Sequence, residues 1–152
     1  MTINRLVGEF FEKMGVEPVA CDDDGVYRFE VDGLQVSFFE NGDYVHFIAA
    51  AGSVPEDGRE ALYRELLTAM FPGEETEQNV ITLMPDDDRV CLYRKEPVER
   101  MELPQFCEAF AAFSESLMKW RDRLAGVPAE GGDAAHDGQP SGHAISDGFM
   151  QV

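Results

Sequence analysis

Apolar residues near the start of the chain recur at helical spacing. Between residues 3 and 14 they stand three or four positions apart, which places them on one side of a helix. These positions are Ile3, Leu6, Val7, Phe10, Phe11 and Met14. Gly15 and Pro18 follow, and both residue types end helices. The pattern therefore predicts an amphipathic helix over residues 3–14.

From residue 27 to residue 49 apolar positions alternate with others, as in strands. Asp32-Gly33 and Asn41-Gly42 interrupt the alternation, and both pairs are favoured in two-residue hairpin loops. Two such loops fix the register of a three-stranded meander. The predicted pairs are Val31–Leu34, Phe29–Val36, Tyr27–Phe38, Phe38–Val45, Val36–Phe47 and Leu34–Ala49.

Both predicted hairpins place these paired side chains on the same face of the meander, which we expect to be the core face. The opposite face is polar at one edge and partly apolar at the other. It carries Arg28, Glu30, Gln35, Ser37, Phe39, Tyr44, His46 and Ile48.

A second helix is predicted over residues 54–71, because Ser53 and Glu56 have the spacing of a capping box and Pro55 suits a first helical turn. An acidic linker, residues 73–78, leads to a second hairpin with strands at 79–84 and 89–95.

The last predicted element is a long helix over residues 103–125, with Pro104 in its first turn. Its apolar stripe needs a partner surface, which is most simply the sheet. The stripe consists of Phe106, Phe110, Phe113, Leu117, Trp120 and Leu124. The predicted fold is α+β, in the order α-β-β-β-α-β-β-α, with a twisted antiparallel sheet packed by helices.

Charge and composition narrow the function. The 152 residues include 30 acidic and 12 basic side chains, for a net charge of −18, which disfavours nucleic acid as a partner. We expect one domain over residues 1–125 and a disordered acidic tail over 126–152, where composition shifts to small and polar residues. No apolar run suits a membrane span or a signal peptide.

Catalytic and metal-binding patterns are weak. Cys21, Cys91 and Cys107 have neither CxxC spacing nor an even number, so we interpret them as reduced thiols. Two aspartate runs, residues 22–24 and 86–88, lack EF-hand spacing and suit solvated turns. His46 has no identifiable partner base and is either an ordinary surface residue or part of a protein contact. We therefore expect no enzyme activity, no metal and no cofactor.

The remaining signal is apolar surface beyond the needs of one small core. Because burial of one large apolar side chain is worth about 1.5–3 kcal/mol, several exposed ones indicate a partner. Such a patch on a strongly acidic body suits a protein that holds apolar segments of another chain.

Over residues 3–125 the sequence resembles the class I type III secretion chaperones, the CesT or Tir-chaperone-like family. The resemblance rests on the order of elements, the acidity and four local patterns. These are FFEKMG at 10–15, VHFIAAAGSVP at 45–55, LYRELLTAMF at 62–71, and the hairpin at 81–93 followed by a helix with Phe110, Phe113 and Trp120. Met70 stands where the family's helix end usually has Asn.

The resemblance implies a cytoplasmic homodimer that binds the N-terminal region of a secreted effector in extended form, without ATP. By analogy, the dimer interface involves Leu62, Leu66, Leu67, Met70 and Ile81. The residues that we expect to contact the client are Leu6, Phe10, Met14, Phe39, Tyr44 and Ile48.

Two other functions stay open at this stage. One is a regulatory or adaptor protein of the same fold that binds a folded partner, such as an anti-activator. The other is a small hydrolase that uses Cys107 or a pair of carboxylates, which we consider the weakest hypothesis because no catalytic set is recognisable.

Overall fold

The computed structural model describes residues 2–72, 78–85 and 87–126. The predicted tail and most of the acidic linker lie outside the described residues, so the domain boundary at residue 125 stays a prediction. The elements are α1 (Thr2–Met14), β1 (Tyr27–Val31), β2 (Leu34–Asn41), β3 (Tyr44–Ser53), α2 (Arg59–Ala69), β4 (Val80–Leu83), β5 (Arg89–Pro97), the 3₁₀ turn η1 (Val98–Arg100) and α3 (Leu103–Leu124). This order confirms the predicted α+β fold class.

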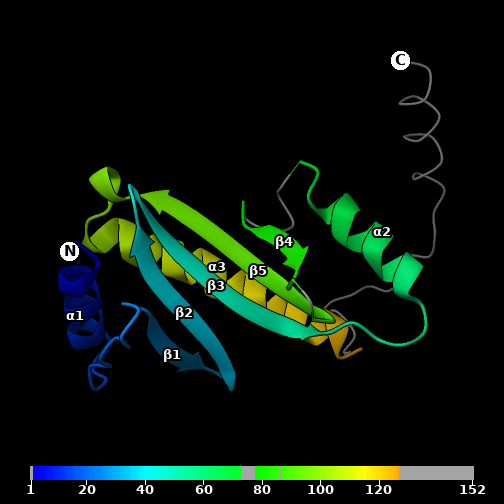
Figure 1. Cartoon of the computed structure of the whole chain (residues 1–152), viewed down its shortest axis with the longest axis horizontal. Helices are drawn as coiled ribbons and strands as arrows, with labels where there is room; N and C mark the ends of the chain where they lie inside the picture. Colours follow the sequence, from blue (N-terminus) through cyan, green and yellow to red (C-terminus); the bar gives the residue numbers. More distant parts are fainter. Residues whose placement is uncertain (1, 73–77, 86, 127–152) are drawn as a thin grey trace, which may run out of the picture.

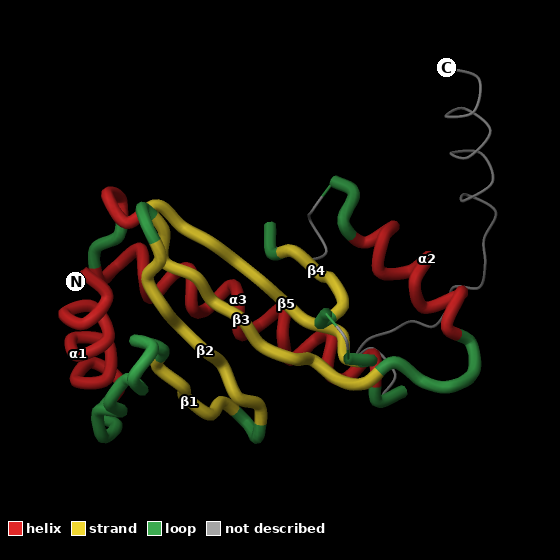
Figure 2. Tube along the Cα trace, in the orientation of Figure 1, coloured by secondary structure: helices red, strands yellow, loops and turns green. Residues whose placement is uncertain are grey.

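The five strands form one antiparallel sheet in the order β1-β2-β3-β5-β4, so β1 and β4 are its edges. The long helix α3 runs behind the sheet, α1 lies at one end, and α2 lies beside β4 at the other end (Figures 1 and 2). The two outer helices therefore stand at opposite ends of a sheet that α3 backs along its length.

The first hairpin has the predicted register, with Phe29 opposite Val36 around an Asp32-Gly33 loop. The predicted register of the second hairpin is wrong: Phe38 pairs with Phe47 and not with Val45, because the loop lies one residue further along the chain. Asn41 pairs with Tyr44, so the loop is Gly42-Asp43, and Gly42 takes a φ of 63° at its first position. A Gly at that position suits a type II′ turn, which competes with the expected Asn-Gly turn. The shift preserves the faces, because each strand keeps its alternation.

The core lies between the sheet and the two helices α1 and α3. Aromatic rings from three elements meet there: the Phe10 ring centroid lies 4.8 Å from that of Phe110, and the Phe38 centroid lies 5.7 Å from that of Phe106. Trp120 is also fully buried. The predicted stripe of α3 is therefore confirmed as the surface that packs on the sheet.

The predicted start of the second helix is wrong. The helix α2 begins at Arg59 instead of residue 54, behind Gly58 in the left-handed conformation. Ser53 belongs to β3, where it pairs with Arg89, and the Val54 amide donates to the Asp88 carbonyl at 2.7 Å. These ladder contacts extend the strand, and the local capping signal is overridden by the tertiary structure.

We predict that Phe10→Glu prevents folding, because Phe10 is 1% exposed and a buried carboxylate would lack a partner. Met14→Glu serves as the control, since Met14 is 53% exposed on the same helix. Circular dichroism and thermal unfolding report the outcome. A folded Phe10→Glu protein with an unfolding midpoint close to that of Met14→Glu would contradict the assignment of Phe10 to the core.

Candidate protein-binding surfaces

One face of the sheet has no helix against it in the described part of the chain. The strand registers place Phe39 opposite His46, His46 opposite Lys95, and Ile48 opposite Tyr93. The alternate positions of the same strands, such as Phe38 and Phe47, point to the core and are fully buried. We call the surface formed by Phe39, Tyr44, His46, Ile48, Tyr93 and Lys95 the open face.

Aromatic contacts organise the centre of the open face. The His46 ring stacks on Phe39, with centroids 4.8 Å apart and planes at 4°. His46 Nδ1 lies 2.8 Å from the Tyr93 hydroxyl oxygen, within hydrogen-bond distance. The Lys95 ammonium lies 4.6 Å from the centre of the Tyr44 ring, a cation–π geometry. Because these contacts hold the side chains in place, the open face is a preformed surface.

The pKa of His46 is lowered from its ordinary value of 6.5, mainly because partial burial disfavours the charged ring. The nearby Lys95 lowers the pKa further, and a hydrogen bond to the Asn41 backbone opposes both effects. At neutral pH the centre of the open face therefore carries an uncharged imidazole among its aromatic rings.

The structure divides the six expected client-contacting residues. Phe39 and Ile48 are half-buried on the open face, and Tyr44 beside them is 39% exposed. Met14 is exposed, but it lies at the end of α1 and not on the sheet.

The remaining two residues of that set, Leu6 and Phe10, are 0% and 1% exposed. They pack in the core, where a client has no access to them. The expectation that they contact a client is therefore wrong in this structure. The reason is that α1 turns its hydrophobic stripe inward, against the sheet and α3.

Tyr93 and Lys95 belong to the open face but were missing from the expected set. Alternation over residues 89–95 does put Cys91, Tyr93 and Lys95 on one side of their strand. The sequence does not indicate that this strand pairs with β3 across the middle of the sheet. Without that long-range pairing, their position next to His46 could not be predicted.

A second apolar surface lies between α2 and the edge strand β4. Leu67 and Phe71 are 75% and 79% exposed, and Leu83 is 39% exposed. A groove of about 390 Å³ runs between the two elements. Its lining residues are Tyr63, Leu66, Leu67, Ile81, Thr82 and Leu83. We call Tyr63, Leu67, Phe71 and Leu83 the α2–β4 patch.

Three of the five expected dimer-contact residues, Leu66, Leu67 and Ile81, line this groove, whereas Leu62 and Met70 do not. Leu67 is strongly exposed, Leu62 and Met70 are partly buried, and Leu66 and Ile81 are buried within the chain itself. Phe71 and Leu83 are not among the expected dimer contacts. The end of the predicted second helix near Phe71 is a signal that could have added Phe71 to them.

Polar contacts hold α2 on the body at both ends. Arg59 Nη2 lies 3.1 Å from Asp88 Oδ2, and Arg123 Nε of α3 lies 2.8 Å from Glu65 Oε1. At the end of α2, the Ile81 amide donates to the Met70 sulfur at 3.4 Å. These contacts set the rotation of α2 about its axis, so that Leu67 faces away from the body.

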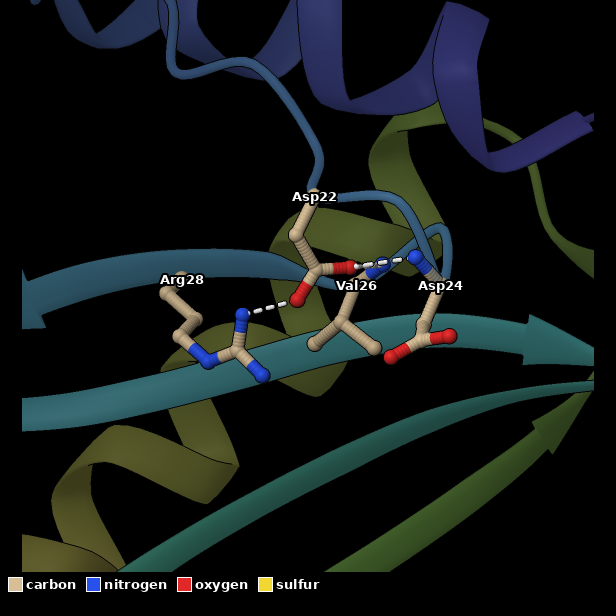
Figure 3. Close-up of polar contacts among 4 residues, drawn as sticks. All are labelled: Asp22, Asp24, Val26 and Arg28. Carbon is tan, nitrogen blue, oxygen red and sulfur yellow. Dashed lines mark hydrogen bonds and ion pairs between the residues drawn. The ribbon is translucent and has the colours of Figure 1, made fainter.

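The aspartate run at 22–24 acts as a turn in the structure. One Asp22 oxygen accepts the amides of Asp24 and Val26, and the other accepts an Arg28 hydrogen bond (Figure 3). The Arg28 side chain is the main reason that the pKa of Asp22 is lowered. Among the residues with described positions, no group of three or more His, Cys, Asp or Glu side chains gathers as a metal site.

The geometry opposes a nucleophile system of Cys107 and His46. Cys107 lies on α3 against the core, whereas His46 lies on the open face, so the sheet separates them. Cys91 is buried in β5, and burial raises the pKa of its thiol. A raised thiol pKa reduces the thiolate fraction that a nucleophile needs.

A family model matches residues 5–121 of the chain and is described as the Tir chaperone protein (CesT) family. The chain belongs to the Tir chaperone protein (CesT) family. The match confirms the family resemblance, and this is a chaperone family, not an enzyme family. Among curated proteins, none matches the sequence significantly.

Solved structures agree on the fold. A structure of the HopA1–SchA chaperone–effector complex matches with a TM-score of 0.65 at 15% identity, over 80% of this chain and 94% of the other. The structure of the ExsC–ExsE complex matches with a TM-score of 0.68 at 18% identity, over 80% of this chain and 92% of the other. The Yersinia pestis type III secretion chaperone SycH, solved with a fragment of YscM2, gives 0.60 at 17% identity, over 76% and 97%.

Within the described ranges, no helix of this CesT-family protein is both long and apolar enough to cross a bilayer. The open face and the α2–β4 patch both leave large apolar side chains exposed or partly exposed. This exposure makes both surfaces candidates for contact with other protein chains.

We predict that His46 makes stability depend on pH. Its folded pKa is below the unfolded value, so the unfolded chain takes up a proton first as pH falls. The contribution of neutral His46 to the free energy of unfolding is therefore fully present above pH about 6.5. It is lost as the pH falls from 6.5 towards the folded pKa of His46.

The measurement is urea unfolding at about pH 7.5 and pH 5, for wild type and His46→Gln. The wild type should lose more stability than the variant over this interval, and an NMR titration should give a His46 pKa below 6.5. Parallel pH dependences for the two proteins, with an unshifted titration, would contradict the prediction.

Proposed function

We propose that this protein is a cytoplasmic type III secretion chaperone that binds the N-terminal segment of a cognate effector in extended form. The bound segment stays soluble and competent for secretion, and no ATP is consumed. Membership of the CesT family supports the chaperone role. The observation that carries the binding mode is the open face, an aromatic surface on a sheet whose other face is sealed by α3.

Three features of the open face support an extended client. It follows β3 from Tyr44 to Ile48, which suits a segment laid along a strand better than a compact domain. Its rings are held by contacts within the chain, so few side chains lose freedom on binding. An unfolded client segment loses conformational entropy when it is ordered, which favours a large contact with several apolar anchors.

The second part of the proposal is a homodimer through the α2–β4 patch. Leu67 and Phe71 are too exposed to stabilise the single chain, and Leu67 lines an apolar groove. A two-fold contact presents the same patch from both copies, so each Leu67 can meet the groove of the other copy. Two open faces per dimer would then be available to one client segment, which increases the effective concentration of the second contact.

We predict that Leu67→Asp turns the dimer into a folded monomer. The change places a carboxylate in an apolar contact, but Leu67 contributes little to the fold of the single chain. Light scattering with size-exclusion chromatography measures the mass. Ala61→Asp is the matched control, because Ala61 is an exposed residue of α2 outside the groove. A Leu67→Asp protein that keeps dimer mass would contradict this interface.

The client is tested by capture of the tagged protein from its own host, with mass spectrometry and limited proteolysis of what it holds. The expected partner is a secreted protein that is protected only in its N-terminal segment. Recovery of a transcription factor or another regulator, bound as a folded domain, would contradict this function and favour the adaptor hypothesis.

We predict that Ile48→Glu weakens binding of the recovered client segment by at least about tenfold, the effect of losing one buried apolar anchor and desolvating a charge. Ile48 lies on the open face, while the control variant Ala111→Glu adds the same charge to an exposed position of α3, on the other side of the sheet. Isothermal titration gives the two dissociation constants. Equal affinities for the two variants would place the client elsewhere.

A further inference from the structure

Charge is distributed unevenly around the open face. The whole chain has a net charge of −18, yet the central side chains of the open face include no carboxylate. Lys95 is their one charged group, and His46 beside it is uncharged at neutral pH because its pKa is lowered. The centre of this face therefore differs from the acidic body around it.

Carboxylates gather instead around the end of the sheet that borders the open face. Tyr44 at the start of β3 pairs with Pro97 at the end of β5, and a hollow of about 510 Å³ begins there. Three carboxylates, from Glu40, Asp43 and Glu99, line it together with Tyr44 and Pro97, and no cation is among its lining residues.

The charges at this end are only partly compensated. Glu40 alternates with Phe39 and lies on the helix side of β2, where it accepts the Ile3 amide at 2.9 Å. Asp43 and Glu99 are exposed and form no ion pair with another described residue, although seven pairs are formed elsewhere in the described ranges. With Lys95 over the Tyr44 ring and Arg100 next to Glu99 in η1 counted, three carboxylates stand against two cations at this end.

This inference rests on the proposed function. We infer that the client segment on the open face is apolar or aromatic in its middle and carries Lys or Arg at the end that lies over Tyr44 and Pro97. The middle of the segment packs on the rings of Phe39 and His46 and on Ile48. A basic side chain at that end reaches Asp43 and Glu99 and the free side of the Tyr44 ring.

Charge also opposes the most accessible alternative occupant, which is the end of this chain. Residues 127–152 contain four acidic residues and neither Lys nor Arg. A segment of that composition would be repelled by the same carboxylates that attract a basic one.

The test uses the full-length protein and three synthetic peptides that share one alternating apolar core. Their flanking residues are Lys and Arg, Ser, or Glu, and fluorescence anisotropy gives the affinities at low and high salt. The basic peptide should bind about threefold to tenfold more tightly than the serine peptide, and the acidic peptide more weakly, since an exposed ion pair has a modest effect. High salt should reduce the difference.

The double variant Asp43→Asn/Glu99→Gln assigns the effect to this end of the face. It should lose the preference for the basic peptide while it keeps the affinity for the serine peptide. The matched control, Glu12→Gln/Glu115→Gln, removes two exposed carboxylates from α1 and α3 and should retain the preference.

Equal affinities for the three peptides, no binding of any of them, or an equal loss of preference in the control would overturn the inference. Failure of the proposed function has a different signature, because it is detected by capture of a folded regulator in place of a secreted protein. A secreted client whose bound segment lacks basic residues, and whose affinity is independent of salt, would leave the chaperone role intact and refute this inference alone.

Discussion

The packing of α3 against a single face of the sheet determines the rest of this structure. Its aromatic stripe meets the rings of Phe10, Phe38 and Phe47, and together they seal one side of five strands. A sheet of this size can be stable with one face covered, because antiparallel strands tolerate a solvated face. The opposite face is then free to carry a binding surface, and its side chains are held by the strands that the core keeps in place.

Because α3 covers only one face of the sheet, the two proposed roles, client binding and contact between copies, have separate surfaces. The proposed client contacts lie on the open face, in the middle of the sheet, where His46 and Phe39 stack between β2 and β3. The proposed contacts between copies lie at the β4 edge, on the exposed side of α2. Because β5 and β4 lie between β3 and α2, a change at Leu67 need not alter the centre of the open face. The acidic body adds solubility and a preference for partners of positive charge.

Much of this architecture follows from local patterns in the sequence. The spacing of the aromatic residues in α3 identifies the helix and its buried side, and the Asp32-Gly33 turn fixes the first hairpin. The failures have long-range causes. Ser53 belongs to β3 because Arg89 of β5 pairs with it, and the Val54 amide bonds to Asp88 just before β5. The capping pattern of Ser53 does not reveal these partners.

The candidate surfaces show the same division. Alternation in β3 correctly placed Tyr44 and Ile48 away from the core, but periodicity alone could not tell whether the stripe of α1 faces inward, so Leu6 and Phe10 were assigned to the client. Tyr93 needed the pairing of β5 with β3, which is set by the whole sheet.

The central claim is that the client lies on the open face, and photo-crosslinking tests it most directly. A photoreactive residue at position 48, in the middle of β3, is compared with one at position 111, on the outer side of α3. With the client bound, we predict a crosslink from position 48 to the N-terminal segment of the client and none from position 111. A crosslink from position 111 without one from position 48 would contradict the account, because the client would then lie on the helical side.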